Sequence, residues 1–124
     1  MNEGLITILA IAIALGWFIL NGYKQDKEFE KFDKGNALFI DVRTPAEFQQ
    51  GSIEGALNFP VQQLNLKIDE LRTLSNDGEM QLVLFCRSGT RSANAYSHLS
   101  KAGLGNLLDG GGYTALQSRL LDEQ

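Results

Sequence analysis

The apolar positions of this chain follow two different patterns, one at its start and one over the rest. Residues 5–20 read LITILAIAIALGWFIL, sixteen positions without a charged side chain. As an α-helix this run spans about 24 Å, and extending it to Gly4 and Tyr23 brings it to the ~30 Å of a bilayer's hydrocarbon core. Trp17 and Tyr23 lie near its end, where interfacial aromatic residues gather. We therefore expect residues 1–23 to be a single transmembrane anchor that contacts the membrane through residues 5–20.

The residues that flank this apolar run predict its orientation. No Lys or Arg precedes it, whereas Lys24, Lys27, Lys31 and Lys34 follow it. Because basic residues favour the cytoplasmic side, we expect a single-pass protein of the inner (cytoplasmic) membrane whose remaining chain faces the cytoplasm. The alternative is a cleaved signal peptide, but the basic start and the small-x-small cleavage site of such peptides are both missing. Residues 24–35 mix acidic and basic side chains, which predicts a charged linker or a first helix.

From residue 36 to residue 124, short apolar runs alternate with amphipathic stretches. The runs at 37–40, 82–85 and 104–108 predict buried strands, and the glycines of 109–112 predict a flexible turn. Helices are expected at four places: from the capping box Thr44-Pro45-Ala46-Glu47 to Gly51, over 61–74, from Ser92 to Ala102, and from Tyr113 onward. This alternation predicts an α/β domain with a central parallel sheet flanked by helices on both faces, and with its ligand site beyond the carboxyl ends of the strands.

Composition narrows the possible partners of this domain. Eleven Lys and Arg against fifteen Asp and Glu give a net charge of −4, which offers no general attraction to nucleic acid. Cys86 is the single cysteine and His98 the single histidine. An internal disulfide is therefore excluded, and neither a metal site nor another cofactor is expected. We assign His98 no role.

The segment Cys86-Arg87-Ser88-Gly89-Thr90-Arg91 joins a predicted buried strand to a helix and carries the chemistry. Backbone amides and the helix dipole at such a junction favour an anion, and a thiolate is one. Arg87 and Arg91 are expected to lower the pKa of Cys86 and to hold an anionic donor such as thiosulfate, while Gly89 lets the amides converge on the sulfur. The alternative, a small apolar residue that closes a strand, does not explain two arginines and two hydroxyl residues within the next five positions.

Four motifs at ordered positions closely resemble the single-domain rhodaneses, the thiosulfate sulfurtransferase-like family. They are Ile40–Phe48 (IDVRTPAEF), Gly51–Asn58 (GSIEGALN), Cys86–Ser92 (CRSGTRS) and Gly110-Gly111. The resemblance implies the three-layer rhodanese fold for residues 36–124, with the anchor as an addition. It implies that Cys86 takes a sulfane sulfur as a persulfide, cradled by the loop amides, and passes it to cyanide or a thiol. It further implies that Asp41, Arg43 and Ser92 support the loop.

Two substitutions depart from the family pattern, and three other functions compete. Ser52 stands where the family commonly has His, and Leu116 where it often has Trp; we interpret both changes as structural.

A phosphatase or arsenate reductase would place one more residue between the cysteine and the arginine than the four that separate Cys86 from Arg91. A membrane-tethered docking module of rhodanese-like type often lacks the cysteine. A thiol redox sensor would need a second cysteine to resolve an oxidised one internally.

Overall fold

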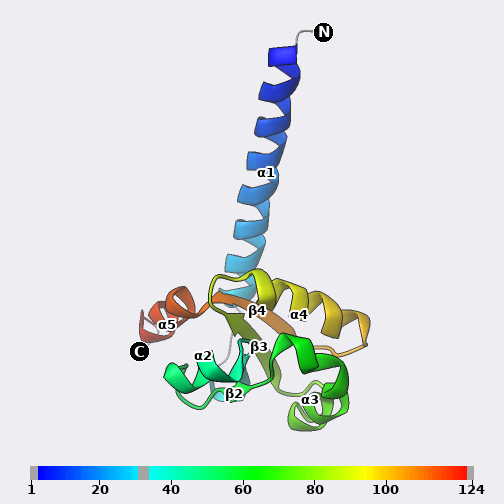
Figure 1. Ribbon diagram of the computed structural model, residues 1–124, viewed down its shortest axis with the longest axis vertical. Coiled ribbons are helices and arrows are strands. Elements are labelled where there is room, and N and C mark those ends of the chain that lie inside the picture. Colours follow the sequence, from blue (N-terminus) through cyan, green and yellow to red (C-terminus); the bar gives the residue numbers. More distant parts are fainter. Residues whose placement is uncertain (1–2, 31–33, 123–124) are drawn as a thin grey trace. The chain divides into compact units, whose positions relative to one another are not determined.

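The computed structural model describes residues 3–30 and 34–122, and the chain falls into two compact units, Met1–Phe32 and Asp33–Gln124. Helix α1 (Glu3–Glu30) belongs to the first unit (Figure 1). Its stretch Glu3–Leu20 has 18 residues and a mean hydropathy of 2.2, enough to cross a membrane by length and composition. A signal sequence meets the same criterion. The division into an anchor at 1–23, a linker at 24–35 and a domain at 36–124 therefore stays a prediction, and residues 31–33 lie outside the described residues.

The second unit is built on a sheet of four parallel strands. They are β1 (Ala37–Asp41), β2 (Leu57–Asn58), β3 (Gln81–Cys86) and β4 (Leu107–Gly112), in the order β2-β1-β3-β4. Residues 37–41 of β1 pair in register with 81–85 of β3, and Cys86 pairs with Gly112 of β4. The chain leaves β1 towards one edge of the sheet and leaves β3 towards the other. The carboxyl ends of β1 and β3 thus form the switch point at which α/β sheets bind their ligands.

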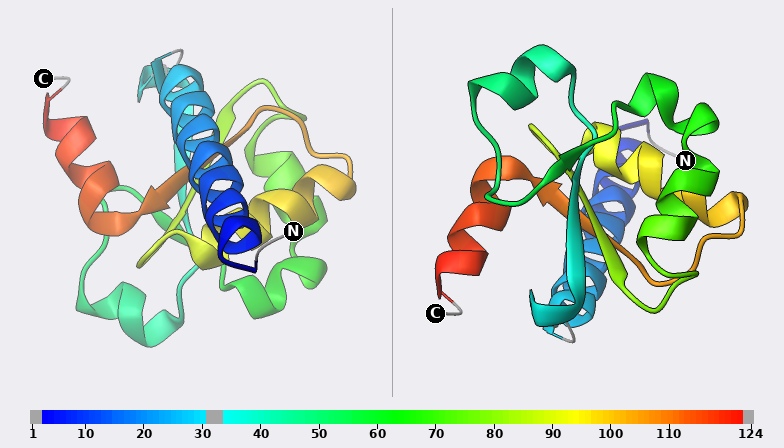
Figure 2. Two further views of the ribbon diagram at one scale, coloured as in Figure 1. Left: turned by 90° about the horizontal axis from the view of Figure 1, so that it is seen from above. Right: turned by 90° about the horizontal axis from the view of Figure 1, so that it is seen from below.

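Helices cover both faces of this sheet, as the alternation of the sequence predicts. They are α2 (Pro45–Gln50), α3 (Ile68–Leu74), α4 (Thr90–Lys101) and α5 (Tyr113–Asp122), with 3-10 turns at Lys34–Asn36 (η1) and Val61–Leu66 (η2). Leu82 and Leu84 point to a buried cluster with Leu71 of α3 and Leu99 of α4. The residues between them face the other way, where α5 packs against β3 and β4. Figures 1 and 2 accordingly show α3 and α4 together and α5 apart from them.

Helix α2 begins and ends where its sequence signals predict. The Thr44 hydroxyl accepts a hydrogen bond from the Glu47 amide (3.2 Å), and a Glu47 carboxylate oxygen accepts one from the Thr44 amide (3.2 Å). Pro45 occupies the first turn and Gly51 follows the last one with φ 142°. Both halves of the predicted capping box are therefore present, and they fix the helix beside the carboxyl end of β1.

Three predictions of local structure are wrong in detail. The stretch 61–74 is not one helix: η2 and α3 meet at Lys67 (φ −117°), although Leu64 and Leu71 are both buried as their spacing predicts. Helix α4 begins at Thr90 rather than Ser92, because Gly89 adopts a left-handed conformation and turns the chain two residues earlier. Strand β4 occupies 107–112, where a turn was expected after 108, because its glycines allow close pairing with β3 around a bulge.

Candidate active site

Cys86 is the last residue of β3 and lies wholly buried beneath the loop that follows it. Its Sγ accepts hydrogen bonds from the amide of Gly89 (2.9 Å) and the amide of Ser92 (3.4 Å). Gly89 has φ 101°, a conformation that costs a residue with a Cβ about 1 kcal/mol or more, and it aims these amides inward. The thiol in turn donates to Ser92 Oγ (3.7 Å), whose hydroxyl donates to the Gly89 carbonyl (3.0 Å).

These hydrogen bonds determine the acidity of the thiol. Burial raises the pKa of Cys86, but hydrogen bonds with the Ser92 amide, with the Ser92 side chain, and with the Gly89 and Ser88 amides lower it more, so that the net pKa lies below its ordinary value. From the sequence, backbone amides and the helix dipole were expected to favour the thiolate, and Arg87 and Arg91 were expected to lower its pKa further. In the structure the groups that lower the pKa most are the backbone amides, as expected, together with the Ser92 side chain, because these neutral dipoles contact the sulfur directly.

The glycines of β4 allow the loop to lie close to the sheet. A Cβ placed on Gly112 would come 3.0 Å from the carbonyl oxygen of Arg87, and one on Gly110 would come 3.0 Å from Cγ1 of Val83. Both separations are shorter than ordinary contacts, so a side chain there would push the loop or the neighbouring strand away. The resemblance singled out Gly110-Gly111; in the structure both Gly111, beside Gly89, and Gly112, beside Arg87, lie against the cysteine loop.

A buried ion pair lies at the carboxyl end of β1, next to this loop. Arg43 donates from Nε to Asp41 Oδ1 (2.9 Å) and from Nη2 to Asp41 Oδ2 (2.7 Å). Arg43 Nη2 also donates to the Gly51 carbonyl (2.7 Å), and the Ser52 hydroxyl donates to Asp41 Oδ2 (2.8 Å). The guanidinium carbon of Arg43 lies 4.9 Å from the ring centroid of Tyr113. The pair therefore ties the end of β1 to the segment after α2 and to the start of α5.

Arg91, in the first turn of α4, is bound to a carboxylate rather than directed at open space. Its Nη1 and Nη2 donate to Glu47 Oε1 (2.7 Å) and Oε2 (3.0 Å). Hydrogen bonding to Arg91 is the largest cause that lowers the pKa of Glu47 to about 2. The same bond is the largest cause that raises the pKa of Arg91, and the charge of Cys86 adds less. Glu47 thus caps α2 and joins it to α4 at once.

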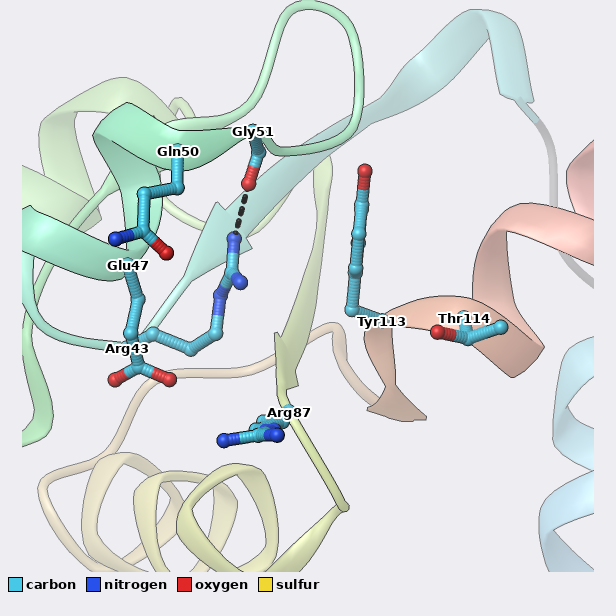
Figure 3. A pocket seen from close by; sticks show the side chains of 7 residues that line it. All are labelled: Arg43, Glu47, Gln50, Gly51, Arg87, Tyr113 and Thr114. Atoms are coloured by element: carbon cyan, nitrogen blue, oxygen red, sulfur yellow. Dashed lines mark hydrogen bonds between the residues drawn. The ribbon is translucent and has the colours of Figure 1, made fainter.

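A pocket of about 360 Å³ opens beside the cysteine loop (Figure 3). It is lined by residues from four segments: Arg43, Glu47, Gln50, Gly51, Arg87, Tyr113 and Thr114. Arg87 follows Cys86 in the chain, and Tyr113 follows Gly112, the strand partner of Cys86. The pocket is therefore adjacent to the cysteine, although the buried sulfur is not part of its lining.

The structure brings the residues selected from the sequence into one region at the switch point. Cys86, Gly89 and Ser92 contact one another, and Arg91 lies in the same turn of helix. Ser88 and Thr90 are exposed, and Arg87 is exposed at the pocket. Asp41 and Arg43 contact the α2 segment and Tyr113 rather than the cysteine itself. No group of three or more metal-binding side chains occurs among the described residues.

Three residues of this region have contacts that were not predicted from the sequence. Glu47 was identified as a helix cap only, and its pairing with Arg91, forty-four positions away, has no local signal. Tyr113 was identified only as a position of the expected last helix, yet it lines the pocket and stacks on Phe85 with ring centroids 6.2 Å apart. Asn58 donates to the carbonyls of Asp41 (2.9 Å) and Arg43 (3.0 Å). Only its place in the GSIEGALN motif could have suggested a role.

Comparison with known proteins shows the family to which this fold belongs. A sulfurtransferase of Allochromatium vinosum is 35% identical over 77 residues, covering 62% of this chain and 67% of that protein. The thiosulfate sulfurtransferase PspE of Escherichia coli is 30% identical over 74 residues, covering 60% of this chain and 68% of that protein. A solved rhodanese with anions from E. coli superposes with a TM-score of 0.56 at 28% identity, over 63% of this chain and 88% of that one. The family model of the rhodanese-like domain matches residues 27–118. This chain belongs to the rhodanese-like domain family, whose relatives include sulfurtransferases.

Proposed function

We propose that this protein transfers sulfane sulfur through a persulfide on Cys86. The observation that carries the proposal is the convergence of the Gly89 and Ser92 amides on Sγ, at 2.9 Å and 3.4 Å. Two amide N–H groups that point at the sulfur stabilise a thiolate before the reaction and a persulfide anion after it, because both species place negative charge on sulfur. A rhodanese from E. coli that is 28% identical to this chain has been solved with anions, which is in keeping with an anionic sulfur donor.

Thiosulfate and cyanide are the donor and acceptor that we propose for assay. The Cys86 thiolate attacks the sulfane sulfur of thiosulfate, the S–S bond of the donor breaks, and sulfite leaves with the electron pair. Cyanide then attacks the outer sulfur of the persulfide, so that thiocyanate leaves and the thiolate returns. Each step exchanges one bond to sulfur for another, and the cycle consumes no oxidant, metal or cofactor.

The position of Arg91 supports sulfur transfer over phosphate hydrolysis. A cysteine phosphatase needs an arginine free to bind a tetrahedral oxyanion, whereas both terminal nitrogens of Arg91 are bound to Glu47. The four residues between Cys86 and Arg91 also make a smaller loop than that chemistry uses. We therefore assign Arg91 to the support of the loop and leave Arg87 as the arginine that meets an anionic donor.

Intact-mass analysis with a Cys86→Ser variant tests the proposal. After incubation with thiosulfate, the wild-type chain should gain one sulfur atom and form thiocyanate when cyanide is added, and the variant should do neither. Because serine resembles cysteine in shape and can still accept hydrogen bonds from the Gly89 and Ser92 amides, the variant should remain folded, and circular dichroism checks this. A wild-type chain that never gains sulfur, or a variant that still forms thiocyanate, contradicts the proposal. The first result would favour a docking module on the same fold.

We further propose that α1 anchors the protein in the inner (cytoplasmic) membrane with the rhodanese-like domain in the cytoplasm. The uncharged run at 5–20 and the lysines that follow it support this arrangement. In inside-out membrane vesicles, added protease should release the domain, whereas vesicles of the opposite orientation should protect it. Release from the second kind of vesicle alone would reverse the orientation, and recovery of the chain in the soluble fraction would refute the anchor.

A further inference from the structure

Tyr113 lies close to the cysteine both along the chain and across the sheet. It is the first residue of α5 and directly follows Gly112, the strand partner of Cys86. Its ring stacks on Phe85, the residue before Cys86 in β3, with ring centroids 6.2 Å apart and 26° between the ring planes. Tyr113 is therefore joined to the backbone of the cysteine by two routes, through Gly112 and through Phe85.

The same ring contacts the buried arginine that follows β1. The guanidinium carbon of Arg43 lies 4.9 Å from the ring centroid, and Figure 3 shows the Tyr113 ring edge-on next to this guanidinium. A cation at this distance over an aromatic ring is attracted to it, and more strongly where water is excluded. Arg43 is 6% exposed and also donates to Asp41 and to the Gly51 carbonyl. The ring of Tyr113 thus links the ends of β1 and β3.

These contacts reach the sulfur through the backbone of β3. Successive side chains of a strand point to opposite faces, so Phe85 lies on the face of α5 while Cys86 belongs to the buried cluster on the other face. The amides of Gly89 and Ser92 come from the loop and from α4, and their distances of 2.9 Å and 3.4 Å to Sγ depend on where β3 ends. A group that holds Phe85 therefore sets the place of the sulfur without contacting it.

We propose that Tyr113 is a positioning residue for sulfur transfer, whose ring holds the end of β3 against the end of β1 and so keeps Cys86 Sγ in line with the loop amides. The inference rests on the proposed function of Cys86 and adds a residue that does not touch the sulfur. It requires the ring and not the hydroxyl, because both contacts are made by the ring. Loss of the ring should lower kcat and leave KM for thiosulfate unchanged, since Tyr113 has no charge with which to bind an anionic donor.

Three variants of the full-length chain in detergent micelles test the role of the ring. Tyr113→Phe keeps the ring, whereas Tyr113→Leu and Tyr113→Met replace it with apolar side chains that have none. With thiosulfate and cyanide as substrates, Tyr113→Phe should keep the wild-type kcat. The other two should lose about tenfold in kcat, within the ~100-fold that a 1 Å displacement can cost. Tyr113 is only partly buried, so all three should fold, and circular dichroism checks this.

NMR signals and a matched control separate positioning from a general loss of packing. The ring current of Tyr113 displaces the Nε–H signal of Arg43, and Cys86 gives the single cysteine signal of the chain. Tyr113→Phe should keep both signals in place, and Tyr113→Leu should move both. Tyr96 of α4 packs against the buried cluster on the other face of the sheet. Tyr96→Leu makes the same substitution there and should leave kcat and both signals unchanged.

Four results would overturn the inference. They are a wild-type kcat in Tyr113→Leu, a loss in Tyr113→Phe as large as that in Tyr113→Leu, an equal loss in Tyr96→Leu, and failure of both ringless variants to fold. The second result would make the hydroxyl the active group, and the last two would show a role in stability only. The two proposals fail separately. If Cys86 takes up no sulfur while its signal moves in Tyr113→Leu, the proposed function alone is contradicted; sulfur transfer that does not depend on Tyr113 contradicts the inference alone.

Discussion

The ion pair between Glu47 and Arg91 makes a sharp prediction about stability and pH. Glu47→Gln removes the charge but keeps a side-chain oxygen that can still accept from the Thr44 amide, because glutamine serves in a capping box as well as glutamate does. The substitution therefore isolates the interaction with Arg91 from the cap of α2. We expect the variant to fold and to lose free energy of unfolding at neutral pH.

The size of the loss follows from the pKa of Glu47. A fall from 4.5 to about 2 corresponds to at most about 3.5 kcal/mol, at ~1.4 kcal/mol for each pKa unit. The two side chains are 27% and 30% exposed, so solvent screening reduces the expected loss to about 1–2 kcal/mol. Since the folded pKa lies below the unfolded one, the stabilisation is complete above about pH 5 and disappears as the pH falls towards 2.

Urea unfolding of the full-length chain in detergent, at pH 7 and at pH 3, measures this loss. A double-mutant cycle with Arg91→Gln should give a coupling free energy of about 1–2 kcal/mol at pH 7 and less at pH 3. The exposed pair Lys67–Glu70, 3.5 Å apart, is the control, and Glu70→Gln should cost no more than about 0.5 kcal/mol. A loss in Glu47→Gln that is the same at both pH values would refute the electrostatic explanation.

Two further predictions concern the thiol and the buried ion pair. Ser92→Ala should raise the pKa of the Cys86 thiol, because the amide and the side chain of Ser92 both lower it in the wild type and only the amide remains. The pH dependence of iodoacetamide alkylation should therefore move to higher pH. An unmoved profile would contradict the role of the hydroxyl. Asp41→Asn should destabilise the domain by about 3–5 kcal/mol in urea unfolding, because Arg43 keeps a buried charge without its partner. A loss below about 1 kcal/mol would show that water or another group replaces the carboxylate.

Local signals in the sequence predicted the elements that depend on local contacts. The strands at 37–40 and 82–85 are confirmed, and so is the capping box of Thr44 and Glu47, because apolar runs and hydrogen bonds within one turn are visible in a short window. The last strand was predicted at 104–108 but lies at 107–112, because a run of glycines in a sequence favours a turn. Those glycines are accommodated in the strand because Arg87 packs closely against Gly112, which the sequence does not reveal. Sequence alone did not reveal that Glu47 binds Arg91, because the two meet only after the sheet has formed.

In the candidate site, too, local structure was predicted and contacts between distant residues were not. The motif around Cys86 predicted a loop whose amides surround a sulfur, and the described geometry has that form. The spacing of Arg87 and Arg91 suggested equivalent roles for both, but a helix turn begins between them. Arg91 therefore points to Glu47, while Arg87 stays at the pocket. Such divergence depends on side-chain direction, which composition and spacing do not specify.

The complete burial of the sulfur separates two properties that labelling experiments often combine: how acidic the thiol is and how often its cover opens. The rates at which a small electrophile and a bulky maleimide alkylate Cys86 would both depend on ionisation of the thiol. The rate of the bulky reagent would also depend on how often the segment after Cys86 moves aside. The ratio of their rates, followed across pH, would thus report the opening of the loop as a quantity of its own.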